Sequence, residues 1–140
     1  MIVLDTNVLS ELMHPRGSQV VRQWVAAQPL TNLFTTTITQ AEILYGIALL
    51  PAGKRQAELN QAAQLMFAED FIGRILPFDE TAAIAFARIA AERRRMGKPI
   101  SQSDAQIASI CSACQATLAT RNVSDFEGCG ITLVNPWELE

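Results

Sequence analysis

Short apolar runs alternate along this chain with longer segments of helical periodicity, and this alternation constrains the fold more than any other feature. Runs that favour β-strands occupy residues 2–4, 33–37, 75–78, 116–119 and 131–134. Strands that alternate with helices need crossover connections, which produce a mainly parallel sheet with helices on both faces. We therefore expect an α/β protein, with three α/β/α layers around a central sheet.

Helix boundaries are marked by capping residues and by proline and glycine. Ser18, Thr39, Asp79 and Ser101 each precede a segment with apolar residues at helical spacing, so we predict that they are N-caps. Further helices are predicted over 8–13 and 54–67. Asp5 directly follows the first strand and has no long helix to cap, so its carboxylate needs another partner.

The chain has 140 residues, of which 49% are hydrophobic and 18% charged, so we expect one globular domain over 1–140. The apolar start ends at Asp5 with no basic segment before it, which does not resemble a signal peptide. No apolar run approaches the roughly 20 residues that cross a bilayer. Because the three cysteines do not resemble a disulfide framework, we expect a soluble, cytoplasmic protein without a membrane partner.

Four acidic residues follow the predicted strands or begin the next helix, namely Asp5, Glu42, Asp104 and Asp125. In parallel α/β sheets ligands bind beyond the carboxyl ends of the strands, so these side chains are expected to converge. Capping is the simpler explanation for three of them, because Thr39-x-x-Glu42, Ser101-x-x-Asp104 and Asn122-x-x-Asp125 resemble capping boxes. Asp5 has no such explanation, and it therefore favours a shared site.

Carboxylates that converge repel one another, by about 4 kcal/mol for two charges about 4 Å apart at an effective dielectric constant near 20. A divalent cation relieves this repulsion, and oxygen ligands without histidine or cysteine select Mg²⁺ or Mn²⁺. The net charge of -3 gives the chain no general attraction for nucleic acid, so a bound cation would also provide the positive potential that a phosphodiester needs.

These observations predict hydrolysis of a phosphodiester by water that a metal ion activates. Asp5 and Asp104 are the expected central ligands, and Glu42 and Asp125 complete or position the site. Residues nearby in the sequence are predicted to hold the carboxylates by hydrogen bonds. They are Thr6, Asn7, Thr120 and Asn122.

A dense basic run lies at a predicted helix end before Asp104. It consists of Arg93, Arg94, Arg95 and Lys98. Cations at a helix C-terminus complement the helix dipole, which explains the run without a function. Contact with RNA phosphates beside the site is the alternative.

Six segments carry a family resemblance. They are Ile2-Val3-Leu4-Asp5-Thr6-Asn7-Val8-Leu9, Thr39-Gln40-Ala41-Glu42-Ile43, Ile75-Leu76-Pro77-Phe78-Asp79, Gly97-Lys98-Pro99-Ile100 with Ser103-Asp104-Ala105-Gln106-Ile107-Ala108, Thr120-Arg121-Asn122-Val123-Ser124-Asp125-Phe126, and Asn135-Pro136-Trp137. Together they resemble the PIN-domain nucleases, in particular the VapC and FitB type of toxin from bacterial toxin–antitoxin pairs.

The resemblance implies a three-layer PIN-like fold, Mg²⁺-dependent endoribonuclease activity, a homodimer and a cognate antitoxin, with higher toxin–antitoxin assemblies as a further expectation. It places Asp5, Glu42 and Asp104 at the positions of the family's acidic ligands. The family's last acid varies between the positions of Asn122 and Asp125, and here only Asp125 is charged. In such pairs the antitoxin often inserts a basic side chain into the acidic pocket.

Three other functions can be compared with the sequence. Haloacid-dehalogenase phosphatases need a second aspartate two residues after the first, where this chain has Asn7. Signal-receiver domains need a lysine late in the chain, and Lys98 is the last one here. A catalytically silent PIN-like protein-binding module is the main alternative, and it would bind neither Mg²⁺ nor Mn²⁺.

Overall fold

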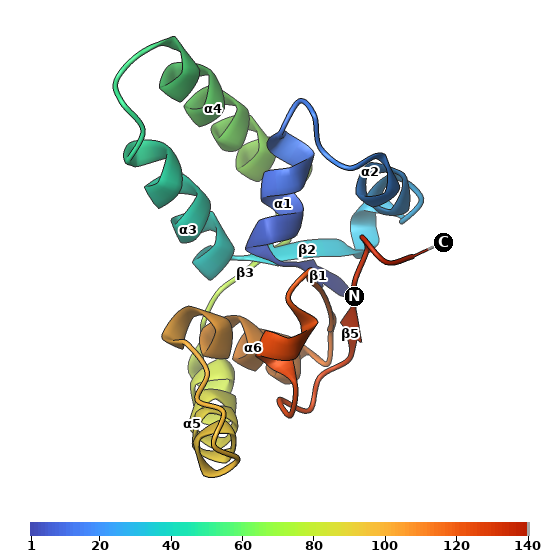
Figure 1. Cartoon of the computed structure of the whole chain (residues 1–140), viewed down its shortest axis with the longest axis vertical. Coiled ribbons are helices and arrows are strands. Elements are labelled where there is room, and N and C mark those ends of the chain that lie inside the picture. The colour runs from blue at the N-terminus through green and yellow to red at the C-terminus, as the bar shows by residue number, and fades with distance from the viewer. Residues whose placement is uncertain (140) are drawn as a thin grey trace.

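The computed structural model describes residues 1–139 and has a five-stranded sheet in the order β3-β2-β1-β4-β5 (Figure 1). Every pair of neighbouring strands in this sheet is parallel. The strands are β1 (Ile2–Leu4), β2 (Leu33–Thr36), β3 (Ile75–Leu76), β4 (Thr117–Ala119) and β5 (Leu133–Val134). All five lie within the predicted runs, and they are shorter than those runs everywhere except at β1.

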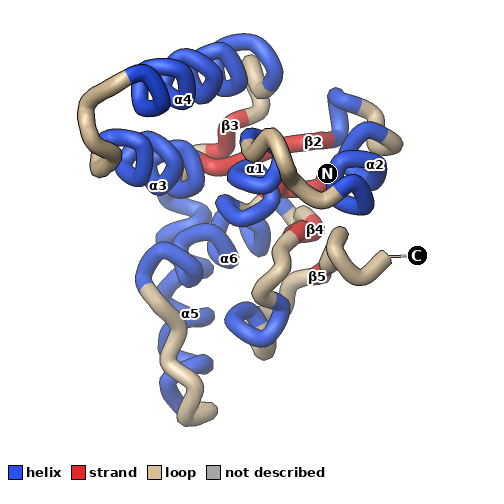
Figure 2. The backbone as a smooth tube through the Cα atoms, turned by 45° about the horizontal axis from the view of Figure 1, so that its top comes forward, coloured by secondary structure: helices blue, strands red, loops and turns tan. Residues whose placement is uncertain are grey.

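Helices cover both faces of this sheet. They are α1 (Thr6–Met13), α2 (Gln19–Ala26), α3 (Thr37–Ala48), α4 (Lys54–Leu65), α5 (Glu80–Arg95) and α6 (Gln102–Cys114), with short helical turns η1 (Leu30–Asn32), η2 (Met66–Asp70) and η3 (Val123–Phe126). Figures 1 and 2 show α1 to α4 on one side of the strands and α5 with α6 on the other. The three-layer α/β/α prediction is confirmed.

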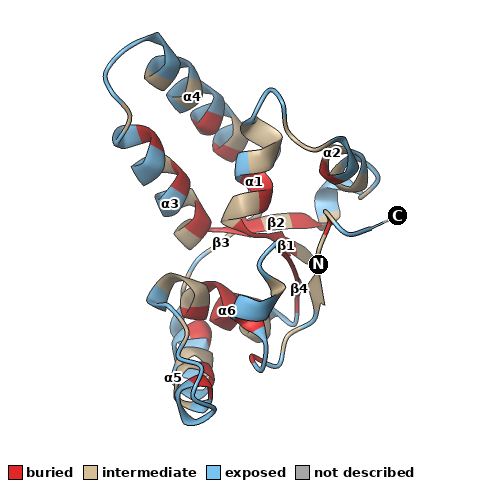
Figure 3. Cartoon of the chain, viewed as in Figure 1, coloured by how far each residue is buried: buried red, intermediate tan, exposed pale blue. Residues whose placement is uncertain are grey.

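The core is divided by the sheet into two apolar clusters. Leu4 packs with Val8 and Leu9 of α1 on one face, whereas its neighbour Val3 packs with Ile107 of α6 on the other. Consecutive strand residues point to opposite faces, and here both faces are covered, which explains why Val3 and Leu4 are both fully buried. Figure 3 shows this buried layer at the centre, with exposed residues on the outer faces of the helices.

Two helices begin earlier than predicted. Thr36, not Thr39, is the N-cap of α3, because its side chain accepts a hydrogen bond from Thr39 N at 3.0 Å. Asp5 is the N-cap of α1 and accepts from Thr6 N at 2.8 Å, so the prediction that Asp5 caps no helix is wrong. In both cases the helix starts directly after a strand, with no loop between. The predicted caps at Ser18, Asp79 and Ser101 are confirmed.

Within residues 1–139, no helix combines the length and the apolar character that a bilayer crossing demands.

Candidate active site

Asp5 lies at the carboxyl end of β1 and is 5% exposed. Thr120, which follows β4, donates its hydroxyl to Asp5 Oδ2 at 2.8 Å, and Asn7 Nδ2 lies 3.3 Å from the same hydroxyl oxygen. Because β1 and β4 are neighbouring parallel strands, their ends place these three residues together. The sequence prediction that Asn7 and Thr120 support Asp5 agrees with these contacts.

Burial, with smaller contributions from the charges of Asp104 and Glu42, raises the pKa of Asp5 to about 6, although hydrogen bonds from Thr120 and Thr6 lower it. The hydrogen bonds therefore offset only part of the cost of burying this carboxylate. The influence of Asp104 and Glu42 on Asp5 shows that the three acids lie within electrostatic reach of one another.

Glu42 of α3 reaches the site through Thr6. The Thr6 hydroxyl donates to Glu42 Oε1 at 2.8 Å and lies 3.1 Å from Thr39 Oγ1. Since a hydroxyl has one hydrogen and an ionised carboxylate only accepts, Thr6 donates to Glu42 and can accept from Thr39. Thr39 is fully buried beneath this pair. The contact of Thr39 with Thr6 was not predicted, because Thr39 was interpreted only as a helix N-cap.

Asp104 lies in the first turn of α6 and is half-buried. Burial raises the pKa of this carboxyl, and the charges of Asp125 and Glu42 raise it further. The Asp104 carboxylate therefore interacts electrostatically with Glu42 of α3 and with Asp125 of η3. It lies between the acids near Asp5 and the segment that carries Asp125.

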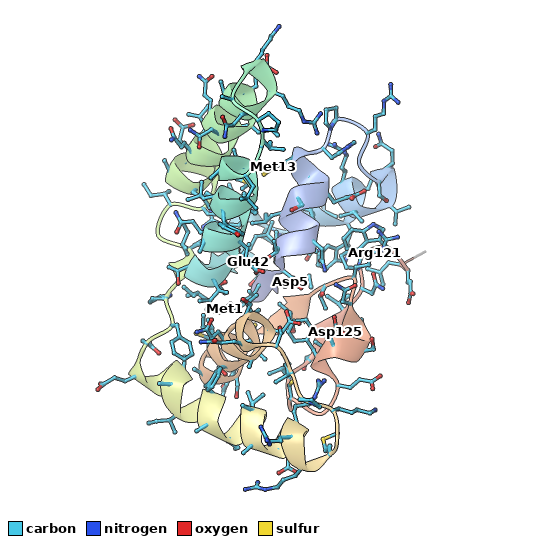
Figure 4. The ribbon with its side chains drawn as sticks, turned by 60° about the vertical axis from the view of Figure 1, so that its left-hand side comes forward. Met1, Asp5, Met13, Glu42, Arg121 and Asp125 are labelled. Atoms are coloured by element: carbon cyan, nitrogen blue, oxygen red, sulfur yellow. The ribbon has the colours of Figure 1, made fainter. Side chains whose placement is uncertain are left out.

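Asp5, Glu42 and Asp104 line a common open cavity of about 440 Å³, which we call the acid cavity. Its other lining residues are Thr6, Asn7, Ser10, Glu11, Arg121, Asn122 and Trp137. Asp125 is exposed on η3 and does not line this cavity, although its charge acts on Asp104. Figure 4 shows Asp5 between Glu42 and Arg121, with Asp125 below Arg121.

Asn122 lines the acid cavity but is exposed and makes no side-chain capping bond at η3. Its backbone N–H donates to Thr120 Oγ1 at 3.1 Å. Asn122 therefore supports Asp5 through Thr120 with its backbone, whereas a direct role of its side chain stays a prediction.

The oxygen donors of this site match a hard divalent cation. Within residues 1–139, no three acidic, histidine or cysteine side chains lie close enough to hold an ion by themselves. Mg²⁺ usually keeps several waters and binds proteins through one or two carboxylates, with substrate phosphate oxygens completing its shell. The residues therefore fit Mg²⁺, and Asp5 and Asp104 are the two cavity carboxylates that would hold it.

Arg93 is not an RNA contact, because it is buried at 5% exposure. Its guanidinium donates to the backbone oxygens of Lys98, Asp125 and Glu127 at 2.7, 2.7 and 2.9 Å. Neither sequence interpretation anticipated this, because both placed Arg93 on an exposed helix end. RNA contact by the exposed Arg94, Arg95 and Lys98 remains a prediction.

A second cavity, of about 520 Å³, adjoins the acid cavity between α1, α3 and α4. Thr6, Ser10 and Glu42 line both cavities, so the two are adjacent and share one wall. We call it the apolar groove, because its walls include Met13, Ile43, Ile47, Leu50, Leu59 and Ala62.

A family model described as "PIN domain" matches residues 2–127 of this chain. The chain belongs to the PIN-domain family. The matched segment of this PIN domain contains all four candidate acids, and its fold agrees with the three layers described above.

Two curated relatives align with this PIN domain over nearly its full length. The plasmid stability protein StbB of Pseudomonas syringae pv. tomato is 42% identical, and the VapC ribonuclease Y4jK of Sinorhizobium fredii is 39% identical. Each alignment covers 99% of this chain and 99% of the relative. The predicted resemblance to VapC proteins is confirmed.

The toxin FitB of Neisseria gonorrhoeae is 36% identical over 98% of this chain and 99% of its own length. The crystal structure of FitAcB from the same organism superposes with a TM-score of 0.93 at 37% identity, covering 99% of this chain and 100% of the other. The similarity to FitB is therefore one of both sequence and fold.

Proposed function

We propose that this PIN domain is a Mg²⁺-dependent endoribonuclease and the toxin of a toxin–antitoxin pair. One observation carries the proposal, namely that Asp5 is buried at the end of β1 within electrostatic reach of Asp104 and Glu42. A buried carboxylate facing two other acids costs free energy unless a cation compensates it. The ribonuclease and toxin names of the relatives agree with this activity.

Asp5 and Asp104 would hold Mg²⁺, for which Mn²⁺ can substitute, and Glu42 and Asp125 would act through bound water. When bound, the ion would activate water and stabilise the charge on a phosphodiester in the transition state. The chain's own contribution is to orient the ligands. Thr120 and the Thr6 N–H fix the two oxygens of Asp5, and the Thr6 hydroxyl fixes one oxygen of Glu42.

RNA cleavage tests this proposal directly. Wild-type protein and Asp5→Asn would be incubated with cellular RNA, with Mg²⁺ and with a chelator. We expect cleavage only by the wild type with metal, because the asparagine keeps the shape of Asp5 but not its charge. Equal cleavage by both proteins would contradict the assignment of Asp5.

The apolar groove is the proposed binding site for the antitoxin. Its apolar walls suit a helical segment, and a basic side chain of that segment would reach Glu42, which lines both the groove and the acid cavity. A cation inserted there would compete with Mg²⁺ for the same carboxylates. The antitoxin would thus inhibit the enzyme by occupying its metal site.

We also propose that the chain forms a homodimer in the cytoplasm and that this dimer joins higher toxin–antitoxin assemblies. Exposed apolar side chains support self-association, including Tyr45 and Leu49 of α3 and Ile84 of α5, which are 66%, 67% and 76% exposed. Light scattering of the purified chain, compared with Ile84→Glu, measures the oligomeric state. A monomeric wild type would contradict the homodimer.

A catalytically silent protein-binding module is the second candidate. It is favoured by the absence, within residues 1–139, of three side chains close enough to ligate one ion unaided. Titration calorimetry with Mn²⁺ separates the two candidates. Binding that Asp104→Asn weakens supports the nuclease, and no binding at all supports the module.

A further inference from the structure

The acid cavity is also lined by a positively charged side chain and an aromatic ring. Among the residues that line it, all of them within the described part of the chain, Arg121 is the one with a positively charged side chain. Its guanidinium carbon lies 5.1 Å from the centre of the Trp137 ring, at cation–π distance. We call this pair the Arg121–Trp137 arm.

The arm is held in place by its own backbone. Asn7 Oδ1 accepts from Arg121 N at 3.3 Å, and Asn135 Nδ2 donates to Arg121 O at 3.4 Å. Asn135 Oδ1 also accepts from Trp137 N at 3.0 Å, so one side chain ties the two members together. The parallel pairing of β4 with β5 brings these two chain exits side by side.

Trp137 is partly buried and packs against the apolar cluster that includes Leu4 and Val8. Arg121, in contrast, is exposed. Among residues 1–139, no carboxylate oxygen lies within 4.0 Å of the Arg121 guanidinium. The Trp137 ring therefore orients the Arg121 guanidinium, whose N–H groups still face solvent. Arg121 lies at the rim of the acid cavity, which is lined by the four carboxylates of Asp5, Glu11, Glu42 and Asp104.

We propose that Arg121 binds a phosphate of single-stranded RNA beside the one that is cleaved, and that Trp137 positions it. This inference rests on the proposed ribonuclease function. A planar guanidinium donates two parallel hydrogen bonds to phosphate oxygens. The acid cavity repels the RNA backbone, so a fixed cation at its rim supplies an attraction that Asp5, Glu42 and Asp104 cannot.

The arm is tested by binding in a background that does not cleave. Asp104→Asn would be titrated with a fluorescent single-stranded RNA oligonucleotide at several salt concentrations, with and without Arg121→Ala. We expect Arg121→Ala to raise Kd about five- to tenfold. The slope of log Kd against log salt should fall by about 0.7, because one phosphate contact to a single strand is lost.

Three further variants make the test specific. Arg16→Ala removes another exposed arginine, which lies outside the cavity, and should change Kd less than twofold. Arg121→Lys should keep the salt slope, because it keeps the charge. Trp137→Leu should weaken binding when Arg121 is present and have no effect in Arg121→Ala, because the ring acts through the guanidinium.

Unchanged Kd and salt slope in Arg121→Ala would overturn the proposal. An equal loss from Trp137→Leu in both backgrounds would overturn the positioning role of the ring. In active protein we expect Arg121→Ala to raise KM and to change kcat less than twofold. If wild-type protein cleaves no RNA while Arg121→Ala still weakens binding, the ribonuclease assignment fails and the RNA-binding arm stands.

Discussion

The guanidinium of Arg93, near the end of α5, donates a hydrogen bond of 2.7 Å to the backbone oxygen of Asp125 on η3. The same side chain also bonds the backbone oxygen of Lys98, which begins the connection to α6 and Asp104. Arg93 thus joins the two segments that carry the acids on the α5–α6 side of the sheet. Its charge also counteracts the rise in the pKa of Asp104.

We predict that Arg93→Met lowers the free energy of unfolding by about 3 kcal/mol, because it removes the donor to three partly buried backbone oxygens. Urea denaturation measures this difference. Arg94→Met is the matched control, since Arg94 is exposed in the same helix turn and its loss should change stability by less than about 0.5 kcal/mol. Equal effects of the two substitutions would show that Arg93 contributes no more than a surface residue.

Metal-free protein should lose stability as pH rises through the titration of Asp5. The unfolded chain releases this proton near the ordinary pKa of 3.8, whereas the folded protein keeps it until about 6. The folded state binds more protons between these values, so the free energy of unfolding falls across that window, by up to about 3 kcal/mol from Asp5. Urea denaturation in chelator at pH 4.5 and pH 7 measures the fall.

Asp5→Asn removes this contribution and should be more stable than wild type at pH 7 without metal. Mg²⁺ should raise the Tm of wild type more at pH 7 than at pH 5, because it binds the ionised carboxylate. The same Mg²⁺ should shift the Tm of Asp5→Asn much less. A wild-type stability that rises with pH across this window would refute the burial cost assigned to Asp5.

The hydroxyl of Thr6 should matter for activity more than for stability. Thr6→Val removes the donor to Glu42 Oε1, and we expect kcat/KM to fall about tenfold, as for other residues that orient metal ligands. Thr6→Ser keeps the hydroxyl and should stay within about twofold of wild type. Cleavage assays on one RNA compare the two, and similar rates for both variants would dismiss the Thr6 contact.

Gly46 offers a way to block the apolar groove without harming the fold. A Cβ atom added at this α3 glycine, which lines the groove, meets nothing within 4 Å, and leucine favours a helix over glycine by about 0.8 kcal/mol. Gly46→Leu should therefore be at least as stable as wild type, cleave RNA normally and bind the antitoxin at least about tenfold more weakly, as when a larger side chain overfills a packed site.

Titration calorimetry with the purified antitoxin gives the affinity for Gly46→Leu. Ala48→Leu is the control, because Ala48 is exposed in α3 and does not line the groove. Normal antitoxin affinity in Gly46→Leu would place the antitoxin elsewhere on the molecule.

Much of the architecture follows from local patterns. The apolar runs predicted all five strands, and the capping residues Ser18, Asp79 and Ser101 predicted three helix starts. The same reasoning failed at Thr39 and Asp5, where a helix follows its strand without a loop. A capping motif shows that a helix begins nearby, but two threonines close together compete for that role.

The acids were predicted from their places after strands, because parallel strands end at one edge of a sheet. The distances between their side chains in the folded protein were not predicted. Asp5, Glu42 and Asp104 share a cavity, but in residues 1–139 no three ligands converge on one point, and Asp125 lies outside the cavity lining. Side-chain reach and rotamer, which decide such distances, depend on packing around each residue.

The sequence by itself determined the layered α/β fold, the family and the edge of the sheet where the acids gather, because these depend on short-range periodicity and on the order of strands and helices. Only the tertiary structure decided that Arg93 is buried, that Thr39 lies beneath Thr6 and Glu42, and that Arg121 meets Trp137. Each of these contacts joins segments far apart in the chain. They exist because the order of the strands and the packing of the helices on the sheet bring separate segments together, and no local pattern specifies which distant residue each segment will meet.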